Sequence, residues 1–268
     1  MEVTPEMASS WLSYRRHPSL RPLSASVAGR YQEDMEAGRW AEATPEGYVF
    51  DSDGWIISAQ HRLKAQANAN ITLRIRVFPN EPRDIAPFLD QGFRRTAAHL
   101  LRVPYATQMG AGARHLAALS DGDRWGMPRY SKVTIPEVVE TYHRWPELSW
   151  YGSDVWAIQY GAGIPAGPHM AVLAQVARTD HRDIIPEWIE GVRTGYNLGR
   201  GDARARLRDR FRHGLQTAGK VNRRDQAYAL IVKAWNAYAS GTPLTVLRQM
   251  ASEPLPTVLD FDFKSAAA

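Results

Sequence analysis

The segment Phe50–Ala65 constrains the fold most, because it reads as strand, tight turn, strand and helix in immediate succession. Asp53-Gly54 predicts a two-residue hairpin turn, since glycine tolerates the positive φ that such turns require. Trp55–Ile57 supplies the second short strand. Ser58 follows and is expected to cap the helix, because its hydroxyl can accept a hydrogen bond from an unpaired amide of the first turn.

The start of this helix is predicted to hold an anion. Its first turns carry four polar or cationic side chains: Gln60, His61, Arg62 and Lys64. Unpaired amides and positive side chains gathered at one helix N-terminus favour a phosphate group, and a guanidinium matches the geometry of phosphate oxygens. In the alternative, structural interpretation, Arg62 pairs with a carboxylate such as Asp51 or Asp90.

Three stretches resemble a known family. Ala59–Ala65 (AQHRLKA) resembles the G-E-R-R-x-R-A box of the ParB N-terminal domain, in the ParB/sulfiredoxin superfold, and is closer still to the D-G-Q-H-R-L-x-A version of phage- and actinobacteria-associated ParB-like proteins. Leu23–Trp40 is similar to their LS…YxxDMxxGxW segment, and Leu89–Leu100 to their DxGxxRTAxxxL segment. The resemblance covers roughly residues 20 to 101, with a weaker echo around Lys233–Ala237.

The resemblance implies a small mixed α/β domain over residues 1–104 that contacts DNA phosphates or a nucleotide such as CTP or ATP with Mg²⁺. The implied phosphate site consists of Ser58, Gln60, His61, Arg62 and Lys64, closed by Arg95 and Thr96. Gln60 stands where the G-E-R-R version has an acid, and glutamine cannot act as a general base, which argues against catalytic turnover. The chain contains no cysteine, so the sulfiredoxin reaction is excluded.

Composition sets wider bounds. The 268 residues suffice for one or two domains, and 44% hydrophobic with 23% charged residues is ordinary for a globular protein. The absence of cysteine excludes disulfides and thiolate metal sites and fits a cytoplasmic protein. No apolar run approaches the ~18 residues of a membrane span. The net charge of +5 permits a polyanionic partner, and residues 264–268 are expected to be a vector-derived tail.

The remainder of the chain predicts an α+β protein with a helical second domain over residues 105–263. Leu73–Phe78 (LRIRVF) alternates apolar and basic residues and is expected to form one half-buried strand. Strand signals vanish after about residue 104. Helices are then predicted at 110–119, 135–145, 147–160, 168–178, 183–194, 202–216 and 223–239, with prolines and glycines near their ends.

A second candidate site is the basic segment from residue 200 to 224, which has nine cations and two acids and therefore a local charge of +7. Leu207, Phe211 and Leu215 form an apolar stripe that can dock this helix, leaving basic flanks for a polyanion. The candidate DNA-binding residues are Arg200, Arg204, Arg206, Arg208, Arg210, Arg212, Arg223 and Arg224. In the structural alternative, the arginines cover apolar surface and pair with neighbouring acids such as Glu187 or Glu190.

A third feature is an aromatic cluster near the centre of the chain: Trp145, Trp150, Tyr151, Trp156 and Tyr160. Such a cluster can stack on the bases of single-stranded nucleic acid. Core and inter-domain packing is the favoured interpretation, because aromatic residues dominate such burial. The eight histidines show no metal-binding spacing, so no metal site is predicted.

The first functional hypothesis is a phage-type, ParB-like DNA- and/or nucleotide-binding protein with an accessory or regulatory role in partition, replication, recombination or repression. One alternative is a nucleotide-dependent phosphotransferase or nuclease that uses Asp51, Asp53 or Asp90 to hold Mg²⁺. The other is a factor that binds and modulates another phage protein. No membrane contact is expected, and the oligomeric state stays open, a homodimer included.

Overall fold

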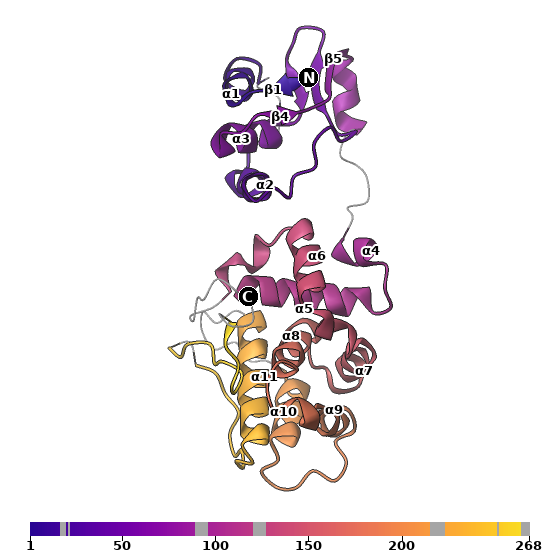
Figure 1. Ribbon diagram of the computed structural model, residues 1–268, viewed down its shortest axis with the longest axis vertical. Coiled ribbons are helices and arrows are strands. Elements are labelled where there is room, and N and C mark those ends of the chain that lie inside the picture. Colours follow the sequence, from indigo (N-terminus) through magenta and orange to yellow (C-terminus); the bar gives the residue numbers. More distant parts are fainter. Residues whose placement is uncertain are drawn as a thin grey trace. The chain divides into compact units, whose positions relative to one another are not determined.

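The computed structural model describes residues 1–16, 20, 22–88, 96–119, 127–214, 223–250 and 252–263. The chain divides into two compact units, Met1–Arg95 and Thr96–Ala268 (Figure 1). The division therefore falls before residue 104, the boundary expected from the sequence, because α4 (Ala97–Leu101) belongs to the second unit. Asp90, Arg95, Leu215 and the tail at 264–268 lie outside the described residues.

The first unit contains a three-stranded sheet in the order β3-β2-β5. Strand β2 (Tyr48–Asp51) pairs antiparallel with β3 (Ile56–Ser58), and the turn between them includes Gly54 at φ +79°. The predicted hairpin is thus confirmed. On its other edge β2 pairs in parallel with β5 (Val77–Glu81), with Tyr48 opposite Val77.

The single strand predicted at Leu73–Phe78 is wrong in its extent. The chain forms β4 (Leu73–Arg74), leaves the ladder at Ile75 and Arg76, and then forms β5. Strand β4 pairs antiparallel with β1 (Glu2–Val3), so the two halves belong to different sheets. The alternating pattern correctly indicated the faces, because Arg74 and Arg76 are exposed and Leu73 and Ile75 are buried.

The helices of the first unit are α1 (Pro5–Tyr14), α2 (Ala25–Glu36), α3 (Gln60–Ala69) and the short 3-10 helix η1 (Arg83–Phe88). Ser24 caps α2, since its hydroxyl accepts a hydrogen bond from the Val27 amide. Helix α3 packs against both α1 and α2. The core lies between these helices and the strands and includes Tyr48, Phe50 and Leu63.

The described part of the second unit consists of helices followed by an irregular segment after α11 (Arg223–Ala239). Besides α4 it contains α5 (Ala106–Leu119), α6 (Ile135–Arg144), α7 (Gly152–Ala162), α8 (Ala166–Val176), α9 (Ile185–Thr194), α10 (Ala203–Arg212), α11 (Arg223–Ala239) and the 3-10 helices η2 (Pro128–Ser131), η3 (Pro146–Ser149) and η4 (Arg182–Ile184). The expected succession of helices is confirmed, except that the single helix predicted at 147–160 is divided into η3 and α7. Described strands occur only in the first unit, and the protein is of the α+β class.

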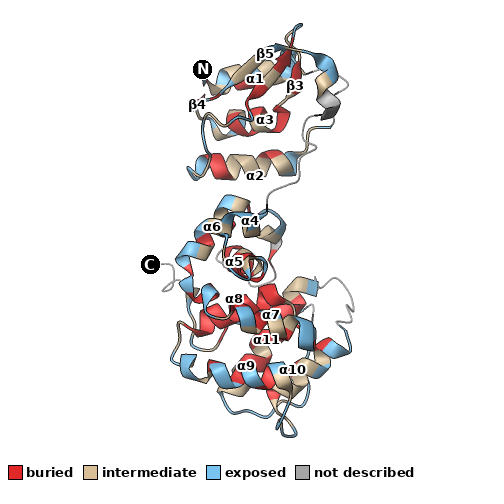
Figure 2. Ribbon diagram, turned by 90° about the vertical axis from the view of Figure 1, so that its right-hand side faces the viewer, coloured by how far each residue is buried: buried red, intermediate tan, exposed pale blue. Residues whose placement is uncertain are grey.

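Helix α8 is the centre of the second unit. Every one of its residues is buried, which fits a sequence without charges (Figure 2). It packs against α5, α7 and α11. Two of its polar side chains bond to neighbouring helices: Trp188 Nε1 donates to His169 Nε2 at 3.1 Å, and Tyr228 donates to Gln175 Oε1 at 3.1 Å.

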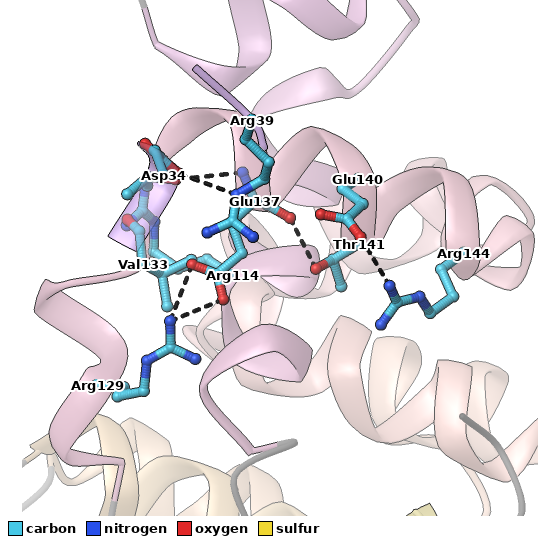
Figure 3. A network of polar contacts seen from close by, with 10 residues as sticks. Asp34, Arg39, Arg114, Arg129, Val133, Glu137, Glu140, Thr141 and Arg144 are labelled. Carbon is cyan, nitrogen blue, oxygen red and sulfur yellow. Dashed lines mark hydrogen bonds and ion pairs between the residues drawn. The ribbon is translucent and has the colours of Figure 1, made fainter. Parts of the chain in front are cut away.

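A polar network fixes α6 beside α5 (Figure 3). Arg129 of η2 pairs with Glu137 at 3.0 Å, and Thr141 donates to the Glu137 carbonyl at 2.8 Å. Arg114 of α5 donates to the Val133 carbonyl. In the part of the chain that the structure describes, no helix has the length and apolar character needed to cross a bilayer.

Candidate nucleic-acid interface

The connection from β3 into α3 differs from the expected capped turn. Ser58 is the last residue of β3 and does not cap the helix. Ala59 occupies the N-cap position at φ +108° and ψ 1°, and no side chain bonds to the first turn there. The strand continues one residue further than its sequence indicates, so the serine hydroxyl is placed too early to reach the helix amides. A residue with a Cβ at this φ carries local strain.

The first two side chains of α3 turn toward the protein. Gln60 and His61 are both buried. Arg16 Nε donates to Gln60 Oε1 at 3.1 Å, and the Ser24 amide donates to His61 Nε2 at 3.0 Å. The first turn of α3 is therefore contacted by Arg16, which follows α1, and by Ser24, the N-cap of α2.

Arg62 bonds to a backbone carbonyl and not to Asp51, which pairs with Arg83, while Asp90 lies outside the described residues. Its Nη2 donates to the Gly47 carbonyl at 3.0 Å, and its guanidinium lies 5.7 Å from the centre of the Tyr48 ring. Burial raises the pKa of Tyr48 to about 12, and the positive charge of Arg62 opposes that rise. Lys64, also on α3, is half-buried. The guanidinium thus anchors α3 to the start of β2.

Asp51 is held by an arginine that the sequence pattern did not single out. Arg83 Nη2 lies 2.5 Å from Asp51 Oδ2 and 3.3 Å from Asp53 Oδ2. Burial alone would raise the pKa of Asp51, but hydrogen bonds from the Trp55 amide and from Arg83 outweigh it and place the pKa below its usual range. Two carboxylates proposed as magnesium ligands are thus bridged by a cation. No cluster of metal-ligating side chains occurs among the described residues.

The structure does not test whether Arg95 and Thr96 close the phosphate site. Arg95 lies outside the described residues. Thr96 belongs to the second unit, where it is the N-cap of α4 and its amide donates to His99 Nδ1 at 3.2 Å. The structure therefore brings together Ser58 and the four side chains of α3, all within the first unit.

The arginines of the basic segment fall into two sets, and the first set is structural. Arg204 binds Asp202 at 2.8 Å and Glu187 at 3.3 Å and lies 4.6 Å from the centre of the Tyr238 ring. The pairing with Glu187 is the one that the structural alternative named. The Arg204 side chain is only 12% exposed. Through Glu187 of α9 and Tyr238 of α11, it links α10 to both of these helices.

Arg208 and Arg224 complete this structural set. Arg208 donates to the carbonyls of Val192 and Arg193 at the end of α9, where carbonyls lack partners within the helix. Arg224 stacks on the Tyr130 ring at 3.6 Å. We call Arg204, Arg208 and Arg224 the inner arginines.

The second set we call the outer arginines: Arg200, Arg206, Arg210, Arg212 and Arg223. None of them pairs with an acid in the part of the chain that the structure describes. Arg200, Arg212 and Arg223 are exposed and make no described hydrogen bond. Arg206 and Arg210 donate to the carbonyls of Leu244 and Gly214, which leaves other guanidinium donors available.

Part of this set borders a depression on the surface of the second unit. It has a volume of about 220 Å³ and is lined by Arg206, Asp209, Arg210, His213 and Leu247. Leu207 and Phe211 of the predicted apolar stripe are buried, and the third member, Leu215, lies outside the described residues. The helix therefore docks as predicted, and the arginines at 206 and 210, one turn apart, stand at its open flank.

The aromatic cluster is mostly not core. Trp145 is buried beneath Arg178, whose guanidinium lies 3.8 Å from the ring centre. Trp150, Trp156 and Tyr160 are exposed by 52%, 45% and 71%. Core packing is therefore wrong for three of the five residues, since α7 turns Trp156 and Tyr160 away from the face that buries Val155 and Ile158. Packing between the two units stays a prediction.

Comparison of the chain with protein-family models, with curated proteins and with solved structures found no match.

Proposed function

We propose that this protein binds DNA through the outer arginines of its second unit. The observation that carries the proposal is the division of the basic segment. The inner arginines bind acids, backbone carbonyls or a tyrosine ring of the protein itself. The outer arginines have no acidic partner among the described residues. A guanidinium without a carboxylate partner keeps its donors and its charge for phosphate oxygens.

DNA is the polyanion favoured by the rest of the chain. The net charge is +5, and residues 20 to 101 resemble the ParB N-terminal domain. The role that follows is accessory or regulatory, in phage-type partition, replication, recombination or repression. Binding through phosphates positions a protein on a duplex without reading its sequence. The affinity is therefore expected to depend strongly on salt and weakly on base sequence.

The test is a fluorescence-anisotropy titration of the full chain with a labelled duplex of about 20 base pairs, at salt concentrations from roughly 50 to 200 mM. The variant replaces Arg206, Arg210 and Arg212 by alanine. Removing one arginine from a phosphate should reduce the slope of log affinity against log salt by about 0.9. The slope is therefore expected to fall by about 2 to 3, with weaker binding at every salt concentration.

Arg144→Ala is the matched control, because Arg144 is an exposed arginine of the same unit that pairs with Glu140 at 2.8 Å. It should leave the affinity and the slope unchanged. Equal binding by the triple variant and the natural chain would reject the outer arginines as the contact surface. Absence of binding by the natural chain at the lowest salt would reject the function itself.

A further inference from the structure

Three exposed aromatic rings form a continuous row on the second unit. The Tyr105 and Trp156 ring centres are 6.3 Å apart, and those of Trp156 and Tyr160 are 5.1 Å apart. Tyr105 is 41% exposed, and the other two are more so. We call Tyr105, Trp156 and Tyr160 the aromatic ladder. Grouped exposed apolar rings of this kind mark interaction sites more often than isolated ones do.

The spacing of residues in α7 and a glycine at its start bring these three rings into one row. Trp156 and Tyr160 are four residues apart in α7 and therefore share one face of that helix. Gly152 precedes Trp156 by one turn on the same line, and a Cβ there would lie 3.1 Å from the Tyr105 Cβ and 2.8 Å from the Met109 Cε. Glycine at this position lets Tyr105 approach α7 closely and extend the row by one ring.

Helix α7, which carries two of the three rings, has little charge of its own. Asp154 is the only charged residue of α7. The amide of Gln108 donates to Gln159 Oε1 at 3.4 Å beside the row. Aromatic faces flanked by side-chain amides suit flat, polar-edged groups, and nucleobases have this character.

Cationic side chains of the same unit are available for the phosphates of a strand whose bases stack on the ladder. Helix α7 packs against α9 and α10, so the ladder and the outer arginines of α10 belong to one unit. Arg182 of η4 lies close to Tyr151 at the start of α7: burial raises the pKa of Tyr151, and the Arg182 charge opposes the rise. Single-stranded nucleic acid is bound by such a combination, with cations along the backbone and aromatic rings against successive bases.

We propose that the aromatic ladder stacks the bases of a single-stranded nucleic-acid segment whose phosphates contact the outer arginines. This inference rests on the proposed function and adds a preference for unpaired strands. A duplex hides its base faces, so the ladder should contribute nothing to duplex binding. The two contributions can therefore be separated by comparing the two kinds of DNA.

The test titrates the full chain with labelled oligothymidine of about 20 nucleotides and with a duplex of the same length. Trp156→Ala and Tyr160→Ala should each weaken oligothymidine binding by about tenfold, within the range measured for removal of one stacked base, and leave duplex binding unchanged. Trp156→Phe keeps a ring and should restore most of the affinity. Trp150→Ala removes an equally exposed tryptophan outside the ladder and should have no effect.

Thermal melting of each variant establishes that it is folded. If both alanine variants bind oligothymidine as the natural chain does, while the arginine variant still loses duplex binding, the ladder proposal is overturned and the DNA-binding function stands. If both DNAs lose affinity equally in the ladder variants, the stacking argument is also wrong. If the natural chain binds neither DNA, both proposals fall.

Discussion

Two buried histidines should make the second unit sensitive to mild acid. His115 of α5 is bonded to the Ala111 carbonyl at 2.8 Å, and the edge of its ring meets the Tyr130 ring. His169 of α8 accepts from Trp188. Burial lowers the pKa of His115 and of His169 to about 4. For His115 the nearby charges of Arg224 and Arg114 act in the same direction, and the carbonyl bond opposes them.

The sign and size of the effect follow from proton linkage. A histidine in the unfolded chain has a pKa of about 6.5. The unfolded state therefore binds more protons than the folded state between about pH 6.5 and pH 4, so stability is complete above this window and is lost as the pH falls through it. Going from about pH 7 to pH 5 costs about 2 kcal/mol per histidine, or ~4 kcal/mol for the pair. Asp202 and Glu253 also have lowered pKa values, but carboxylates lose their contribution only below about pH 4.

The measurement is urea unfolding of the full chain across this pH range, followed by hydrogen-exchange mass spectrometry of peptides that cover α5 and α8. The free energy of unfolding of these helices should fall steeply as the pH is lowered, and the double variant His115→Gln/His169→Gln should show a much flatter profile. His143→Gln changes an exposed histidine of α6 and should follow the natural profile. A free energy that stays constant from about pH 7 to pH 5 in the natural chain refutes the assignment of two buried, neutral histidines.

Three further predictions concern stability and are measured by urea unfolding. Gly112→Ala should cost about 1–3 kcal/mol, because the new Cβ would lie 2.5 Å from a side-chain carbon of α8; Gly161→Ala, which meets no atom within 4 Å, should instead stabilise α7 by about 0.5–1 kcal/mol. Ala59→Gly should leave stability unchanged or raise it, since relief of the strained φ offsets the removal of the methyl group, and a clear decrease would contradict this. Arg204→Ala should cost about 2–3 kcal/mol by removing charged hydrogen bonds at a largely buried site, and a neutral result would show that its hydrogen bonds are dispensable.

The helices of the second unit were predictable because their signals are local. Prolines and glycines mark their ends, and the apolar period identifies their buried faces. The sheet was less predictable because the sequence of a strand does not determine which other strand it pairs with. Leu73–Phe78 alternates as one strand should, yet its two halves pair with β1 and β2, which are separated in the chain by α1 and α2.

The same limit applies to the candidate site at α3. The sequence of Ser58–Lys64 predicted a helix that begins there, and a helix does begin at Gln60. The groups that occupy its tip are Arg16 and the Ser24 amide, more than thirty residues away in the chain. The local sequence pattern therefore located the helix but could not show that its polar side chains are engaged by the protein itself.

The arginines of the basic segment look alike in the sequence but have two kinds of surroundings in the structure. Arg204 and Arg208 lie on the flank of α10 that faces α9, where Glu187 and the carbonyls of the last helical turn receive them. Arg206 and Arg210 lie on the other flank, beside the depression near Leu247. Substituting the inner set should weaken DNA binding only by unfolding the second unit, whereas substituting the outer set should weaken it in a protein that melts normally. The basic segment is thus evidence for a polyanion partner only through its outer arginines, and a charge-reversal experiment that mixes the two sets would not distinguish binding from folding.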